Sequence, residues 1–234
     1  MIIAENLCKA YRTNKGWNQV LDNVSVTFPD GRNVGILGLN GSGKSTLLRL
    51  IGGAEPPDSG RIVKNVRTSW PIGFSGGFQK GMSGREATRF VSRIYGSNER
   101  DTERFVSEFA ELGPYFDMPI GTYSSGMRGR LTFAISIAMG FDCYLVDEVT
   151  AAGDRRFKEK YRDAFKELGR RASVIMVSHQ SATIKQFCDM AAVLHDGELT
   201  LYDDIDEGMA IYDSINAERR ALRERPRRAV RQAS

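Results

Sequence analysis

The chain has 234 residues, 41% of them hydrophobic and 26% charged, which is ordinary for one α/β domain with a sizeable core. No window approaches 18 apolar residues and the N-terminus lacks a basic start, so we expect neither a membrane-spanning helix nor a signal peptide. The net charge of +4 lies in residues 218–234, where seven Arg and two Glu give +5 and leave −1 for the rest, which excludes an overall basic bias toward nucleic acid.

The cysteines and histidines argue against two kinds of structure. Cys8, Cys143 and Cys188 form no C-x-x-C pair, so we expect reduced and mostly buried thiols. With only His179 and His195 in the chain, a His/Cys metal site is not expected.

The first thirty residues predict an antiparallel beginning. Residues 2–7 form a short expected strand, and residues 24–28 alternate apolar and polar side chains as a half-buried strand does. The Pro-Asp-Gly sequence at 29–31 is a turn that leads into the next strand. Tyr11 follows the first strand, either as an ordinary aromatic or as a ring that stacks on adenine.

A phosphate-binding loop follows at residues 38–46, GLNGSGKST, between an apolar strand and a helical pattern. Glycines let backbone N–H groups converge on phosphate oxygens, and the following helix adds a partial positive charge. Lys44 is expected to reach the β- and γ-phosphates, and the Ser45 hydroxyl is expected to hold Mg²⁺. The residues assigned here to nucleotide binding are Gly38, Asn40, Gly41, Ser42, Gly43, Lys44, Ser45 and Thr46.

Three further candidate segments lie between residues 73 and 139. Gln79 lies in a Gly-rich segment at 73–86, where it is either solvated or able to ligate Mg²⁺ or orient water. Residues 85–112 have a helical pattern that Gly113-Pro114 ends. Residues 123–131, YSSGMRGRL, open a helix that runs to about Met139, where Ser125-Gly126 is either a cap or an anion site.

An apolar strand at 143–146 ends in two carboxylates, Asp147 and Glu148, which is a Walker B arrangement. Asp147 is expected to bind Mg²⁺, and Glu148 to accept a proton from the attacking water. An amphipathic helix at 155–171 and a buried strand at 173–177 follow, and His179 stands where that strand ends. Ligands bind at this edge of an open α/β sheet, so His179 is a candidate donor to the γ-phosphate.

The last part of the chain holds a hairpin, a helix and a basic tail. His195 lies in the hairpin sequence LHDGEL and is interpreted as surface. A helix is expected at 205–222 from apolar residues at helical spacing. The Arg-rich tail at 218–234 is expected to be disordered and solvated, with contact to anionic lipid as the alternative.

Taken together, these motifs resemble the ATP-binding subunit of ABC transporters over about residues 1–215. Order and spacing carry the resemblance, because Ser124 lies 80 residues after Lys44, Asp147 lies 23 after Ser124, and His179 lies 31 after Glu148. The resemblance implies a P-loop NTPase core, a mostly parallel sheet with flanking helices, joined to an N-terminal antiparallel β subdomain and to a helical subdomain at about 84–140. It assigns the aromatic stack to Tyr11, the Q-loop to Gln79, the switch histidine to His179, the D-loop to Asp154, and the signature to Ser124, Ser125, Gly126 and Met127.

Two departures from the common family pattern point to a branch. The usual L-S-G-G-Q signature reads Tyr-Ser-Ser-Gly-Met at 123–127, and the usual D-E-P-T reads Asp-Glu-Val-Thr at 147–150. This combination resembles the branch that exports bacterial surface polysaccharides, and the absence of a C-terminal sugar-binding domain is similar to the capsular exporters. O-antigen, teichoic-acid and other lipid-linked glycan exporters remain the alternatives.

The resemblance also implies the assembly. Two copies close head to tail on two ATP molecules, with Mg²⁺, so that the phosphate loop of one subunit faces Ser124 and Gly126 of the other. The cycle is passed to a separate integral-membrane permease, which places the chain peripherally on the cytoplasmic face of the bacterial inner membrane. The docking surface is expected beside segment 73–86 and helical segment 85–112.

Two rival functions fit the sequence less well. A soluble ABC-type ATPase of DNA repair would carry a long coiled coil between phosphate loop and signature, and a translation factor would carry a second phosphate loop. A P-loop kinase or GTPase is disfavoured by the Asp-Glu pair, the signature loop and the lack of an N-K-x-D motif.

Overall fold

The computed structural model describes residues 1–14, 16–72, 78–147, 155–178 and 180–231, and it contains two sheets. The larger sheet has the order β5-β6-β3-β7-β8 and comprises β3 (Asn33–Gly38), β5 (Cys143–Asp147), β6 (Ser173–Val177), β7 (Met190–His195) and β8 (Glu198–Tyr202). Strands β5, β6, β3 and β7 pair in parallel, and β8 pairs antiparallel with β7. The predicted mostly parallel core is therefore confirmed, with the ends of β3, β5 and β6 at one edge.

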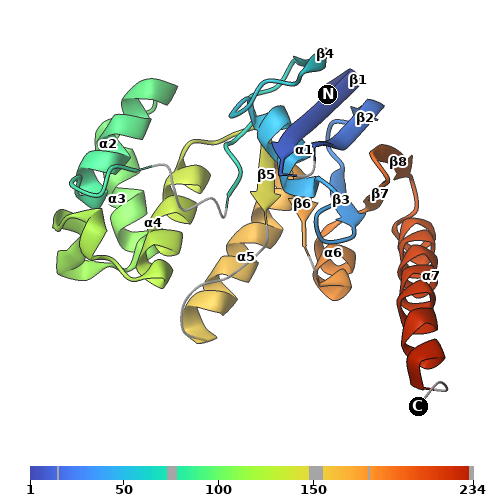
Figure 1. The fold of residues 1–234 in the computed structure, drawn as a ribbon. Coiled ribbons are helices and arrows are strands. Elements are labelled where there is room, and N and C mark those ends of the chain that lie inside the picture. The colour runs from blue at the N-terminus through green and yellow to red at the C-terminus, as the bar shows by residue number, and fades with distance from the viewer. Residues whose placement is uncertain (15, 73–77, 148–154, 179, 232–234) are drawn as a thin grey trace.

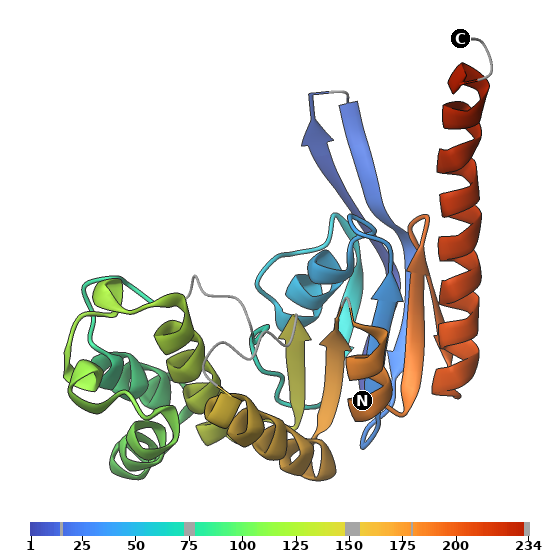
Figure 2. The same cartoon turned by 90° about the horizontal axis from the view of Figure 1, so that it is seen from below.

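The smaller sheet has the order β2-β1-β4 and is wholly antiparallel. Its strands are β1 (Ile2–Thr13), β2 (Gly16–Phe28) and β4 (Ser59–Lys64). Both hairpin strands are longer than the strands expected at 2–7 and 24–28, because pairing continues to Thr13↔Gly16. Tyr11 is consequently inside β1, paired with Asn18. Figure 2 shows this hairpin projecting beyond the carboxyl edge of the larger sheet.

A helical group lies to one side of the larger sheet (Figure 1). It contains α2 (Gly84–Tyr95), α3 (Glu99–Ala110), the 3₁₀ turns Gly113–Asp117 and Ile120–Thr122, and α4 (Ser125–Ala138). The single helical run expected at 85–112 is thus two helices, because Gly96 ends α2 in the left-handed conformation and the Asn98 side chain caps α3. Arg85 holds the group together through ion pairs to Glu103 at 2.8 Å and Asp117 at 2.6 Å.

Helix α5 (Arg155–Arg171) attaches the helical group to the sheet, as its amphipathic pattern predicts. Phe157, Tyr161, Phe165 and Leu168 are all buried. The Tyr161 ring stacks on Phe133 of α4 with centroids 3.8 Å apart, and Phe157 meets Phe109 of α3 edge-on. The helical group therefore shares one hydrophobic core with the larger sheet.

The remaining helices are α1 (Lys44–Gly52), α6 (Ser181–Phe187) and α7 (Ile205–Arg231). Helix α7 continues to Arg231, which corrects both the expected end at 222 and the expected disordered tail over its helical part. Its first half packs on the core through Ile205, Met209, Tyr212 and Ile215. Once that half is fixed, the Ala, Arg and Glu residues that follow favour continuation of the helix, against the cost of Pro226, which removes one backbone hydrogen bond. Within the described residues, no helix is long and apolar enough to span a membrane.

Candidate nucleotide site

The phosphate loop joins β3 to α1 through a backbone that only glycine fits. Gly41 and Gly43 have φ of 82° and 104°, in the left-handed region. A Cβ on Gly43 would also lie 2.3 Å from Val20 Cγ1 of β2, and one on Gly38 would lie 2.6 Å from the Leu194 carbonyl oxygen of β7. The loop therefore packs closely against β2 and β7, and with no side chains at Gly38 and Gly43 its backbone remains accessible to a ligand.

The first turn of α1 supplies positive charge to the loop. No side chain caps this helix at Gly43, and no acidic residue lies in its first turn. Lys44 is 5% exposed, and its Nζ donates to the carbonyls of Gly38 and Leu39, both at 2.8 Å. Among the described residues, the buried Ser42 Oγ has no hydrogen-bond partner. The uncapped N–H groups of α1, the Lys44 ammonium and the unpaired Ser42 hydroxyl together fit an anion such as a polyphosphate.

Ser45 and Asp147 meet although 102 residues separate them in sequence. The Ser45 hydroxyl donates to Asp147 Oδ1 at 3.1 Å, because β5 and β3 end at the same edge of the sheet. Hydroxyl and carboxylate oxygens are the ligands Mg²⁺ prefers when substrate phosphates complete its shell. This pair fits the metal of a nucleotide complex.

Tyr11 lies beside the start of α1, within reach of Thr46. Its hydroxyl is 2.9 Å from both carboxylate oxygens of Glu55 and 3.4 Å from Thr46 Oγ1, and Arg49 Nη2 donates to it at 3.1 Å. Burial raises the pKa of Glu55, but hydrogen bonds from Tyr11, Arg49 and Lys9 outweigh it and leave that pKa lowered. The hydroxyl is thus fixed by charged partners, and the ring is held near the loop.

The signature residues lie on another part of the molecule, in the helical group. Ser124 is the N-cap of α4, and its Oγ accepts a hydrogen bond from Met127 N at 3.2 Å. Beneath it Tyr123 is buried, and its hydroxyl donates to the Tyr115 carbonyl at 2.5 Å. Ser124 and Ser125 are exposed. The helix start is capped as predicted, but by Ser124 and not by Ser125-Gly126, which lie in the first turn; that turn leaves the anion alternative open.

The remaining predicted site residues are three that the structure does not describe, and Gln79, which it does. Glu148, Asp154 and His179 lie outside the described residues. Gln79 is described and exposed, and its backbone carbonyl accepts from Met82 N at 3.1 Å. His195 is half-exposed at the end of β7, 3.4 Å from Asp196 in an ion-pair geometry, as its surface interpretation expects.

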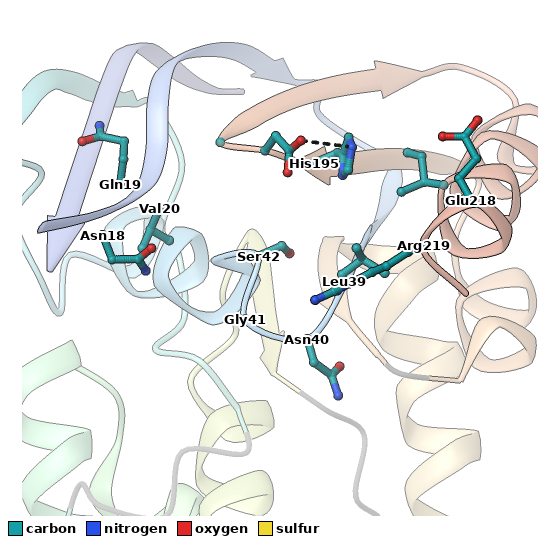
Figure 3. Close-up of a pocket in the computed structure, with 13 residues that line it drawn as sticks. Asn18, Gln19, Val20, Leu39, Asn40, Gly41, Ser42, His195, Glu218 and Arg219 are labelled. Carbon is teal, nitrogen blue, oxygen red and sulfur yellow. Dashed lines mark ion pairs between the residues drawn. The ribbon is translucent and has the colours of Figure 1, made fainter. Parts of the chain in front are cut away.

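Sequence reasoning missed the residues that support Tyr11 and those that face the loop from α7. Glu55 and Arg49 belong to no motif; Arg49 lies on α1 and Glu55 lies between α1 and β4, and both contact the Tyr11 hydroxyl. A pocket of about 560 Å³ adjoins the loop at residues 39–42 (Figure 3). The other walls come from β2, the β7–β8 turn and α7: Asn18, Gln19, Val20, His195, Asp196, Gly197, Ile215, Glu218 and Arg219.

The fold and the loop define a P-loop nucleotide-binding domain, and comparison with known proteins narrows the class. The family model described as ABC transporter matches residues 21–151, more than half of the chain, so the chain belongs to the ABC transporter family. Its fold is also similar to a solved structure of the ATP-binding cassette MJ0796, a dimer in a post-hydrolysis state bound to ADP and Pi. That match has a TM-score of 0.73 and 23% identity, and covers 85% of this chain and 96% of the other.

Two relatives are similar over almost their whole length. The polysialic acid transport ATP-binding protein KpsT of Escherichia coli is 49% identical over 215 residues, which cover 91% of this chain and 98% of KpsT. The capsule polysaccharide export ATP-binding protein CtrD of Neisseria meningitidis serogroup B is 45% identical over 215 residues, covering 92% of this chain and 100% of CtrD.

Proposed function

We propose that this chain is the ATP-hydrolysing subunit of a bacterial exporter that moves a capsular polysaccharide across the inner membrane through a separate permease. The observation that supports ATP hydrolysis is the 3.1 Å hydrogen bond between Ser45 and Asp147, next to Lys44, which is bound to the loop carbonyls. The near full-length similarity to KpsT and CtrD supports the capsular cargo.

Each residue has a distinct part in this proposal. Lys44 and the uncapped start of α1 bind the phosphates, and Ser45 and Asp147 hold Mg²⁺, which neutralises charge on the β- and γ-phosphates. Glu148 accepts the proton of the attacking water, and Gln79 and His179 orient the water and the γ-phosphate. The Tyr11 ring stacks on the adenine.

The site needs a second copy of the chain. The exposed signature turn of α4 belongs to the helical group, on the other side of β5 from α1 (Figure 1). We place the phosphate loop of one subunit opposite Ser124, Ser125 and Gly126 of the other, with Asp154 of the D-loop at the same interface. ATP then closes the homodimer, and hydrolysis reopens it.

The permease docks on exposed apolar side chains of the helical group. Phe90 and Ile94 of α2 are 53% and 60% exposed, and Phe105 of α3 is 37% exposed. The three belong to the apolar positions of the predicted helical segment, and the structure leaves them exposed. We name this surface the α2–α3 apolar face and propose it, with the adjoining segment 73–86, as the contact that holds the chain at the membrane.

The ATPase assignment is tested by two variants. Glu148→Gln should bind MgATP, hydrolyse it far more slowly and accumulate as a closed dimer in sedimentation. Lys44→Ala should lose ATP affinity and export. Near-normal turnover in the first variant would remove Glu148 from the proton-accepting role, and unchanged affinity in the second would refute the phosphate-loop assignment.

The cargo is tested separately. Deletion of the gene, followed by chemical analysis of surface and intracellular glycan, should show polymer retained inside the cell, and the Lys44→Ala chain should not restore export. Polymer at the surface of the deletion strain would contradict the capsular assignment and leave the ATPase assignment standing.

A further inference from the structure

Helix α7 brings its second half to the nucleotide edge of the sheet. The first half is held on the core through Tyr212 and Ile215 among others. The helix lies beside β7 and β8, at the opposite side of the sheet from β5, and its C-terminal end extends beyond the carboxyl edge of the sheet in the same direction as the β1–β2 hairpin (Figure 2). Arg219 therefore lies on the wall of the pocket that the phosphate loop forms (Figure 3).

Two hollows meet between α7 and the loop, and both are lined by Leu39, Asn40 and Arg219. The larger, of about 560 Å³, also has the carboxylates of Glu218 and Asp196 on its wall. The smaller, of about 290 Å³, is otherwise lined by Tyr212, Asn216 and Arg220 and has no acidic side chain. Two guanidinium groups without a carboxylate suit an anion, so the smaller hollow is the anion-binding end.

The position of Lys44 shows which part of a nucleotide would reach this end. A phosphate-loop lysine contacts the β- and γ-phosphates. Lys44 Nζ lies 2.8 Å from the carbonyls of Gly38 and Leu39, at the strand end of the loop. The terminal phosphate is therefore expected beside residues 38–40, where Leu39 and Asn40 form the wall shared with Arg219.

Arg219 is available for such a contact. It is half-buried, and within the described part of the chain no hydrogen bond or ion pair of its guanidinium is found. Arginine presents several N–H donors in a fixed plane and binds phosphate oxygens in pairs. The backbone of Arg219 is already ordered on α7, so a contact with phosphate has to order only the side chain.

We propose that Arg219 is a second cation for the terminal phosphate of the nucleotide held in the same subunit, and that it makes the site prefer ATP over ADP. This inference rests on the proposed ATPase function and adds a specificity residue to it. It also couples α7 to the nucleotide, because only the triphosphate reaches Arg219.

The test compares two ligands on four proteins. Fluorescent derivatives of ADP and of a non-hydrolysable ATP analogue are titrated, with Mg²⁺, into wild-type chain, Arg219→Ala, Arg219→Lys and the control Arg104→Ala. Arg104 is a 72%-exposed arginine of α3 that pairs with Asp101 at 3.2 Å. Protein is kept dilute enough to stay monomeric, as sedimentation confirms.

The expected result is selective. Arg219→Ala should weaken the ATP analogue about fivefold and ADP less than about twofold, since a half-exposed charged contact is worth little more. Arg219→Lys should recover part of the loss, and Arg104→Ala should bind both ligands as wild type does. The Lys44→Ala chain, in contrast, should lose both ligands.

Three results would overturn the inference. Equal effects of Arg219→Ala on the two ligands, or none, would show that the terminal phosphate does not reach Arg219. A loss that is absent in the monomer and appears only when the titration is repeated at a concentration where the chain dimerises would place Arg219 at the subunit interface instead. A wild-type chain that binds neither ligand would refute the proposed function as well, so the two failures are distinguishable.

Discussion

Replacing Tyr11 by Phe and by Ala separates the two roles assigned to this side chain, stabilisation of the fold by the hydroxyl and adenine stacking by the ring. The hydroxyl is bound by Glu55 at 2.9 Å and Arg49 at 3.1 Å, which stabilises the fold. The ring is proposed to stack on adenine. Tyr11→Phe keeps the ring and removes only the hydroxyl, whereas Tyr11→Ala removes both.

The expected sizes follow from the contacts. After the hydroxyl is removed, Glu55 retains its ion pairs with Arg49 at 3.2 Å and Lys9 at 3.3 Å, so its charge is not left unpaired. Tyr11→Phe should therefore cost only about 1 kcal/mol of unfolding free energy, or about 2–4 °C in Tm. Tyr11→Ala should in addition weaken ATP about tenfold, since base–aromatic stacking contributes about 1–3 kcal/mol.

The cost of Tyr11→Phe should depend on pH with a definite sign. The pKa of Glu55 is lowered in the fold, so its stabilising contribution is complete above its ordinary value of 4.5 and is lost as pH falls through the lower folded value. The Tm difference between wild type and Tyr11→Phe should thus be largest near neutral pH and shrink below about 4.

Thermal unfolding and nucleotide titration of both variants provide the measurement, with Tyr115→Phe, a 46%-exposed tyrosine of the helical group, as the matched control. ATP affinity that survives in Tyr11→Ala would refute stacking. ATP affinity that falls equally in Tyr11→Phe would assign the effect to the hydroxyl network.

Three further predictions concern the loop, the thiols and the surface. Gly43→Ala should lower ATP affinity strongly, because φ of 104° strains any side chain; nucleotide titration checks it. Cys143 and Cys188 should resist iodoacetamide at pH 8 until the chain unfolds, since burial raises the pKa of each thiol to about 12; mass spectrometry of labelled peptides checks it. Phe90→Ser with Ile94→Ser should leave Tm nearly unchanged but abolish co-purification with the permease.

The sequence located the core elements well because local signals and tertiary packing agree there. The predicted bounds of β6 and α5 match the structure, and β5 extends the predicted strand only by Asp147. The approach of Ser45 to Asp147 could also be anticipated, since parallel strands that precede such motifs end at one edge.

Other features depend on tertiary contacts that no local sequence pattern predicts. The spacing of Phe90 and Ile94 is that of a buried helix face, and only the packing of α2 shows that they are exposed. The length of α7 was missed because a charged composition with Pro226 suggests a solvated tail, whereas the anchored first half lets the helix continue. Glu55 and Arg49 contact Tyr11 because α1 and the segment after it pack beside β1, which sequence spacing does not give.

The capping role of Ser124 is compatible with its proposed place at a nucleotide in the other subunit. A serine hydroxyl has one O–H donor and two acceptor lone pairs. In the structure the Ser124 Oγ accepts from Met127 N, which uses acceptor capacity and fixes the rotamer. The O–H proton is left to donate, and a phosphate oxygen is an acceptor. In the proposed dimer the cap that starts α4 would orient the same hydroxyl toward the neighbouring γ-phosphate. Ser124→Ala should therefore weaken both the helix start and ATP-dependent dimerisation, whereas Ser124→Asp, a capping side chain with no proton to donate, should keep the helix start and fail in dimerisation.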